Sequence, residues 1–382
     1  MNRLQFFAIT LFCSFHFVLS GQRTISGHVT DAEDNEPIPN ATVFINNTKS
    51  GITTDLTGMY QLIIPGEGSY NLRVSHAGYQ PVFYDIEPGK ESVNFDVSLV
   101  SLSLDEVLVV KKIKVSKSDI ELFWTSLLGE NPSKRTIYAV NTKAPYFYYD
   151  SQTKIFKVTC RDFIHVINNI TGYYIRVWLD YFIYDHTINT TFWKIDLVFS
   201  ELEPKNQEQK DLWDENRRKT YNVSRGKFIK SLYNNTMIED GFLFIRYSLK
   251  GVPDRLVIDP VYDLSQFFSD DSLKNYKEFY IRQEIDDLVL ACYGRPVIQP
   301  NLISPLQITS GVMSNHNQLN AQVFMNWKNV GLYRNRIQTL NGSIRIFPDG
   351  TYSNMMKLSP VFGSKPISGI NMLLPIEYVP DK

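Results

Sequence analysis

Apolar and polar residues alternate along short segments between residues 21 and 100, and clusters rich in Asn, Asp, Gly and Pro separate these segments. A period of two is typical of strands with one buried face, and two sheets of such strands pack into a sandwich. The pattern therefore predicts a seven-stranded β-sandwich over residues 21–100. Its strands are expected at 25–29, 43–45, 52–54, 62–64, 72–74, 82–86 and 93–99.

The rest of the chain is predicted to be a linker followed by a larger β-rich domain with a few helices. Residues 101–118 include the lysine-rich stretch 111–117, which is typical of a solvated linker. The C-terminal domain is expected over 119–382, with helices near 119–128, 205–221 and 225–234. Ser118 is the predicted N-cap of the first helix and Gly129 its end. The fold class is therefore mainly β.

Four strands of the C-terminal domain are rich in aromatic residues. They are expected at 146–150, 154–160, 173–184 and 191–199, the first two forming a hairpin. We attribute the aromatic content to β propensity and sheet packing.

One stripe of the second expected helix is the candidate binding site. Trp213, Asn216, Arg217 and Tyr221 recur there at helical spacing. An arginine beside aromatic rings can hold a carboxylate or stack on a planar or sugar surface. The alternative is that the stripe docks the helix on the sheet and Arg217 binds a carboxylate or a strand end.

The N-terminus has the pattern of an export signal. Arg3 precedes an apolar stretch that ends in Val18-Leu19-Ser20, which favours a signal peptide over residues 1–20 with cleavage after Ser20. A lipoprotein signal is disfavoured because the bulky Phe12 precedes Cys13. After processing, Cys160 and Cys292 remain, and this number allows one disulfide without implying it.

Four short motifs carry a family resemblance, at residues 25–31, 37–43, 54–60 and 76–79. Together they resemble the carboxypeptidase regulatory-like domain, a prealbumin-like sandwich, close to the immunoglobulin type, that also precedes the plug of TonB-dependent receptors. Asp55, Gly58 and Gly78 are structural turn residues in this reading, and Asn40 replaces the family's usual Gly. Residues 104–110 look like the segment that follows this domain in such receptors, whereas parts of the C-terminal region resemble uncharacterised envelope proteins.

The resemblance raises the question of zinc peptidase chemistry, which the residues do not support. The histidines outside the expected signal are scattered without ligand spacing, at His28, His76, His165, His186 and His316. No serine-hydrolase elbow or phosphate-binding glycine loop occurs, and the acidic pairs at 270–271 and 286–287 are expected to be solvated. We expect no catalytic residue, metal or cofactor.

A formal net charge of -1 also argues against a nucleic-acid partner. The sequence thus predicts a non-catalytic cell-envelope binding or scaffold protein with a protein or glycan partner. The expected location is the periplasm, or the periplasmic face of the outer membrane with peripheral association, in a gram-negative bacterium. Two alternatives stay open: an envelope hydrolase with an unfamiliar site in the C-terminal domain, and an accessory of a TonB-dependent uptake system.

Overall fold

The structure is a computed structural model. It describes residues 23–89, 91–102, 115–129, 136–222, 224–237, 239–240, 242–248, 255–261, 268–269, 275–280, 287–293, 308–309, 332–335, 337–339, 343–353, 358–360 and 369–381. The expected signal peptide, most of the expected linker, His316 and the acidic residues 270, 271 and 286 lie outside these ranges. No helix of the described parts is both long enough and apolar enough to cross a membrane.

The N-terminal strands form a two-sheet sandwich, hereafter the sandwich. One sheet has β1 at its centre, antiparallel to β4 and parallel to β7 and β8, and the other has the order β3-β2-β5-β6. The strands are β1 (Thr24–Asp31), β2 (Thr42–Ile45), β3 (Gly51–Thr53), β4 (Met59–Ile63), β5 (Tyr70–Ser75), β6 (Val82–Ile86), β7 (Val93–Asn94) and β8 (Val97–Leu99).

The sandwich core consists of the residues that the alternation placed on the apolar faces. Ile25, Val29, Val43, Leu72 and Val74 are almost completely buried in one cluster. The predicted mainly β fold is confirmed, with one difference: the seventh expected strand is divided into β7 and β8. At the division the Phe95 N–H donates to the Ser26 carbonyl and an Asp96 carboxylate oxygen accepts from the His28 N–H.

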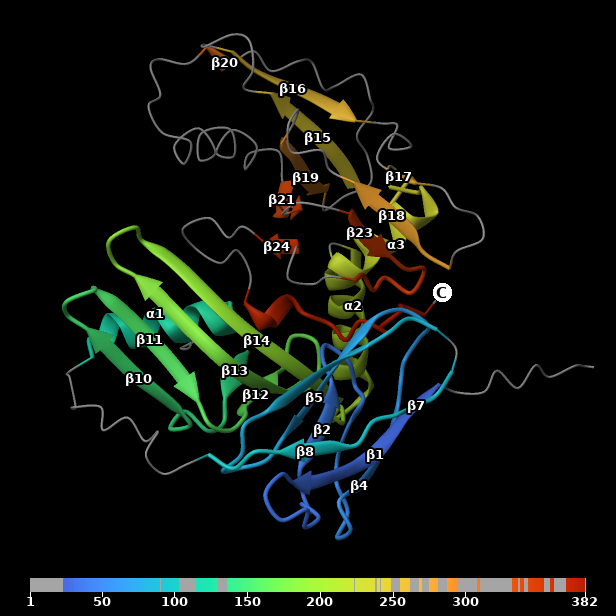
Figure 1. Cartoon of the computed structure of the whole chain (residues 1–382). Coiled ribbons are helices and arrows are strands. Elements are labelled where there is room, and N and C mark those ends of the chain that lie inside the picture. Colours follow the sequence, from blue (N-terminus) through green and yellow to red (C-terminus); the bar gives the residue numbers. More distant parts are fainter. Residues whose placement is uncertain are drawn as a thin grey trace, which may run out of the picture.

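A separate sheet of six strands, hereafter the aromatic sheet, follows the sandwich in the chain (Figure 1). Its central strand β13 pairs with β14 along one edge and with β11 and β12 along the other, and β10 and β9 lie outside β11 and β12. The strands are β9 (Ile137–Ala139), β10 (Pro145–Asp150), β11 (Ile155–Cys160), β12 (Ile164–Asn168), β13 (Tyr173–Asp185) and β14 (Thr190–Glu201). Strands β9 and β12 are not among those that the sequence pattern predicts.

Helix α1 (Lys117–Leu128) covers one face of the aromatic sheet, behind it in Figure 1. Phe123 and Leu127 are buried there with Phe156 and Phe182 of the sheet. The N-cap is Ser116, whose hydroxyl accepts the Asp119 N–H, so the expectation that Ser118 caps the helix is wrong. Either serine suits a cap; the helix begins earlier because Ser116 has the extended backbone that a cap needs. Gly129 ends the helix in a left-handed conformation.

Two helices connect the aromatic sheet to the remaining strands, α2 (Gln207–Asn222) and α3 (Arg225–Asn234). Ser224 caps α3, and Phe228, Ile229 and Leu232 on one of its faces are buried. The remaining elements are β15 (Phe242–Ser248), β16 (Arg255–Val261), β17 (Phe268–Ser269), β18 (Lys277–Tyr280), β19 (Asp287–Tyr293), β20 (Ile308–Thr309), β21 (Leu332–Asn335), β22 (Ile337–Thr339), β23 (Ser343–Ile346), β24 (Leu358–Pro360) and the 3-10 helix η6 (Ile370–Met372).

Candidate binding face

The two faces of the aromatic sheet have different neighbours. The inner face packs on α1, while the opposite face, hereafter the outer face, meets the sandwich only over its middle part. Cross-strand partners place Trp178, Asp196 and Val198 in that middle part, because alternate residues of a strand share a face. The outer face thus has a covered zone between two open ends.

A row of three side chains on the sandwich lies over the covered zone. Phe44, Arg73 and Phe83 are cross-strand partners on β2, β5 and β6, at the positions that alternate with the sandwich core. Phe44 meets Phe163 edge to face at 5.4 Å between ring centroids and clusters with Val198. The face of the sandwich that simple alternation leaves to solvent is here an interface.

Arg73 is the centre of this interface, with a side chain only 1% exposed. Its guanidinium binds Asp196 at 2.6 Å and Asp180 on the other side, and it lies between the rings of Phe83 and Trp178, 4.0 and 4.7 Å from their centroids. Burial lowers the pKa of Arg73 and raises that of Asp196, and in each case the partner's charge opposes the change. The two charges therefore depend on each other.

A β-bulge aims Asp180 at this arginine. The register between β13 and β14 shifts between Leu179 and Tyr181, so Asp180 is the extra residue. Its carboxylate also accepts the Trp178 indole N–H at 3.0 Å and pairs with Lys194 at 3.1 Å. Bulges commonly re-aim a side chain in this way.

The β2–β3 turn of the sandwich closes the free edge of β14. The Asn47 N–H donates to the Leu197 carbonyl, and the Phe199 N–H donates to the Thr48 carbonyl. The Asn46 amide donates to Asp196 and accepts the Leu197 N–H. An edge strand otherwise offers unpaired backbone groups to other chains, so this turn both joins and protects the sheet.

One open end of the outer face carries exposed aromatic residues. Phe192, Ile183, Lys157 and Tyr148 are successive cross-strand partners on β14, β13, β11 and β10. Tyr181 and Tyr146 lie on the same face two residues further along their strands. We call these six residues the aromatic row; its Tyr146, Phe192 and Tyr181 side chains are 58%, 49% and 37% exposed.

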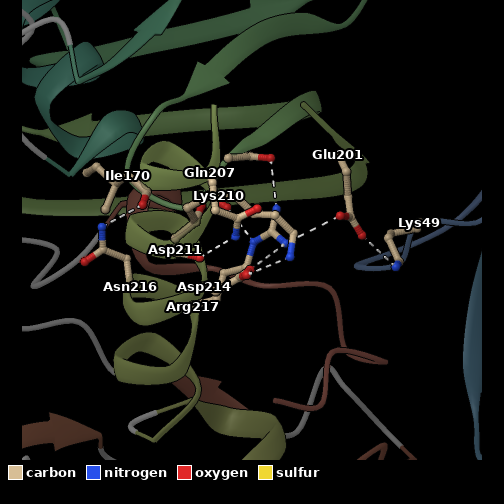
Figure 2. Close-up of polar contacts among 11 residues, drawn as sticks. Lys49, Ile170, Glu201, Gln207, Lys210, Asp211, Asp214, Asn216 and Arg217 are labelled. Atoms are coloured by element: carbon tan, nitrogen blue, oxygen red, sulfur yellow. Dashed lines mark hydrogen bonds and ion pairs between the residues drawn. The ribbon is translucent and has the colours of Figure 1, made fainter. Parts of the chain in front are cut away.

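The stripe that the sequence singled out on α2 points at the loop between β12 and β13. Trp213 donates to the Asn169 carbonyl at 2.8 Å, and Asn216 donates to the Ile170 carbonyl at 2.9 Å. Arg217 donates to the carbonyls of Thr171 and Gly172 at 2.6 and 3.1 Å. The contacts of these three residues are those of the docking alternative; Figure 2 shows Asn216 beside Ile170 and the position of Arg217. Tyr221 is half-buried and meets the ring of Tyr378.

Arg217 also heads a short series of ion pairs (Figure 2). It lies 3.4 Å from Glu201, which in turn lies 3.0 Å from the Lys49 ammonium of the sandwich. Burial alone would raise the pKa of Glu201, but the hydrogen bond and charge of Lys49 and the charge of Arg217 together lower it. The Arg217 guanidinium lies over the ring of Tyr173, 4.3 Å from the centroid.

The turn residues of the sandwich take part in local structure. Asp55 accepts the N–H groups of Thr57 and Met59, and Gly58 has a positive φ of 76° with the Val29 carbonyl 2.5 Å from where a Cβ would lie. Gly78 has a φ of 86° with open space around it. Asn40 adopts the left-handed backbone that its replacement of Gly requires.

The remaining candidate groups give no reactive cluster within the described ranges. Cys160 on β11 is a free thiol, and burial raises its pKa. His28 lies in β1 beside Asp96, and His165 in β12. No group of His, Cys, Asp and Glu in the described part of the chain could hold a metal ion.

One match to a known domain family falls on the sandwich and the residues that follow it. Residues 25–109 match the CarboxypepD_reg-like domain. The chain is 27% identical over 105 residues to TonB-dependent receptor P3 of Formosa agariphila, which covers 27% of this chain and 10% of the receptor. It is 28% identical over 163 residues to carboxypeptidase D of Anas platyrhynchos, or 40% of this chain and 12% of that protein. The matched regions span about a tenth of the length of these relatives.

Among solved structures, a chain of a type II cohesin–X-dockerin complex from Acetivibrio cellulolyticus aligns with 28% of this chain and 74% of its own length. The sequence identity is 18% and the TM-score is 0.18, so no argument rests on this similarity. The family-model match bears out the predicted resemblance for the sandwich.

Proposed function

We propose that this protein is a non-catalytic binding or scaffold protein of the gram-negative cell envelope, and that its protein or glycan partner docks on the aromatic row. The observation that carries the proposal is the row itself: exposed aromatic side chains from β10, β13 and β14 on one face of one sheet, next to a tightly packed interface. Such residues are usually buried or engaged when they gather on one surface, and they dominate binding energies in many interfaces.

The sandwich supports the row as a rigid neighbour. Phe83 is 47% exposed and borders the row, where Lys194 lies 4.7 Å from its ring centroid. Lys194 is also the cross-strand partner of Tyr181. A partner on the row would therefore also reach the edge of the sandwich.

The receptor match favours a second candidate of the same class, an accessory of a TonB-dependent uptake system. Its support is the 27% identity with the TonB-dependent receptor over 105 residues. For the accessory of an uptake system, the partner on the aromatic row is an envelope receptor. For the general binding or scaffold protein, the partner is a protein or a glycan.

The test is binding of the purified protein to a panel of envelope polysaccharides and solubilised outer-membrane receptors, measured by biolayer interferometry. The triple variant Tyr146→Ala/Tyr181→Ala/Phe192→Ala should weaken binding at least about tenfold, equal to about 1.4 kcal/mol. Leu212→Ala is the control, because Leu212 is 52% exposed on α2 and away from the row. Equal binding by the triple variant would disprove the role of the row. Turnover of an envelope polymer, abolished by a point mutation, would disprove the non-catalytic assignment.

A further inference from the structure

The far border of the covered zone, on the side away from the aromatic row, carries a different chemistry, centred on Arg176, the cross-strand partner of Val198. Arg176 lies on β13, opposite His165 on β12, and Tyr174 lies two residues earlier on the same face. The covered zone around Trp178 separates this border from the aromatic row. A ligand at Arg176 therefore would not need the aromatic row.

Arg176 differs from Arg73 and Arg217, which join parts of the fold. Arg73 and Arg217 each bind oxygen atoms directly, whereas no described residue forms a hydrogen bond or ion pair with Arg176. Its guanidinium lies 5.6 Å from the ring centroid of Phe163. Burial lowers the pKa of Arg176, and only the neighbouring Tyr174 opposes this change. A partly desolvated guanidinium without an oxygen partner is costly unless a ligand supplies one.

One group beside Arg176, the cross-strand partner His165, can share an anion with it. The Tyr174 hydroxyl is hydrogen-bonded to Nδ1 of His165, and when it donates this bond, the Nε2–H of His165 is a donor for a ligand. Gly51 of the sandwich forms another wall: a Cβ there would lie 3.2 Å from Nη2 of Arg176. The arginine thus lies at the junction of the sheet and the sandwich.

We propose that Arg176, together with His165, whose ring Tyr174 orients, binds an oxyanion, the carboxylate or phosphate group of a small acidic ligand. The planar guanidinium matches both groups in a bidentate arrangement, and the ring of Phe163 holds the guanidinium from one side. His165 adds a second donor. A neutral sugar without an acidic group has no such partner.

The experiment is isothermal titration calorimetry on the purified protein at low salt, with inorganic phosphate, acetate, glucuronate and glucose as probes. Saturable binding is expected for phosphate, or for acetate and glucuronate, but not for glucose, and this pattern distinguishes the two anion chemistries. Arg176→Gln should weaken the binding at least about tenfold and His165→Gln about threefold. Arg176→Lys, which keeps the charge but not the planar fork, should lie between the wild type and Arg176→Gln.

Arg161→Gln is the matched control, because Arg161 also lies near a ring, 5.7 Å from the centroid of Tyr146, at the other end of the face. It should bind like the wild type. Urea unfolding midpoints of all variants confirm that each is folded. The proposal is overturned if no anion binds saturably, if glucose binds as well as the anions, or if a folded Arg176→Gln protein keeps wild-type affinity.

Discussion

Arg73 and Arg217 are both buried arginines that join separate parts of the chain, but they do so with different acceptors. Arg73 joins the sandwich to the aromatic sheet through two carboxylates, of which Asp196 is also buried. Arg217 joins α2 to the sheet mainly through two backbone carbonyls, and its carboxylate partner Glu201 is half exposed. Loss of Arg73 would leave the charged carboxylates of Asp180 and Asp196 without their partner, whereas loss of Arg217 would leave mainly neutral backbone carbonyls without a donor. The first interface should therefore be the more sensitive to substitution.

The largest effect is expected for Arg73→Met. Removing one member of a buried ion pair typically costs about 3–5 kcal/mol, because the remaining charge is left uncompensated. The free energy of unfolding from urea denaturation measures this loss. The double variant Arg73→Met/Asp196→Asn should recover part of it, since the stranded charge of Asp196 is removed as well. No recovery in the double variant would mean that packing, not charge, dominates this interface.

Gly172→Ala should be next, with a loss of about 2–4 kcal/mol, because it combines backbone strain with a steric clash. Gly172 has a φ of 69°, and a Cβ there would lie 2.3 Å from the indole of the buried Trp213. Gly78→Ala is the control: its φ is also positive, but nothing lies near the new Cβ. It should cost only the strain, about 1–2 kcal/mol. Equal losses in urea unfolding would contradict the clash.

Arg217→Lys sharpens the comparison with Arg73 by keeping the charge. A lysine cannot donate to the carbonyls of Thr171 and Gly172 at once, and a buried acceptor without a partner costs about 1–3 kcal/mol. The expected loss is at the lower end, because the Leu202 N–H also donates to the Gly172 carbonyl. Hydrogen exchange of the 169–172 loop and urea unfolding measure the effect. A loss as large as that of Arg73→Met would remove the distinction between the two arginines.

The smallest effect concerns pH and Glu377, whose carboxylate accepts the Lys49 N–H at 2.6 Å. Burial raises the pKa of Glu377, and hydrogen bonds from backbone N–H groups oppose this. Because the pKa of Glu377 is raised in the folded state, the contribution of this residue to the free energy of unfolding is complete below the ordinary glutamate pKa. It is lost as the pH rises through the raised pKa of the folded state. The stability of Glu377→Gln relative to the wild type should therefore increase from acid to neutral pH in urea unfolding. A flat difference would count against the burial of this charge.

The strands of the sandwich were predictable because their alternation is local. Leu72 and Val74 on β5 point into the core, as their spacing indicates. Arg73 between them was overlooked, although a charged residue inside such a short apolar run is a usable signal. Its partners lie more than a hundred residues away in sequence, so their identity could not be read from the pattern.

In the aromatic sheet, alternation predicted strands but not which rings are exposed. Without the bulge at Asp180, Trp178 and Phe182 would share a face; with it, Trp178 lies on the outer face and Phe182 in the core. The aromatic row and its exposure therefore depend on one extra residue. The docking of the α2 stripe was among the alternatives that the sequence allowed. Its hydrogen-bond acceptors could not be predicted, because they are backbone carbonyls of the 169–172 loop and do not depend on the side chains there.

The sequence by itself determined the parts of this protein that rest on nearest neighbours along the chain: the sandwich strands, the Asp55 and Gly58 turn, and the capping of α3 by Ser224. Tertiary structure decided whether the other face of each strand is buried or exposed. It buried the Arg73 interface and paired the edge of β14, it left the aromatic row exposed, and it set the surroundings of Arg176. The physical reason is that periodicity reports one buried face of a strand, while the partner of the other face comes from a distant segment.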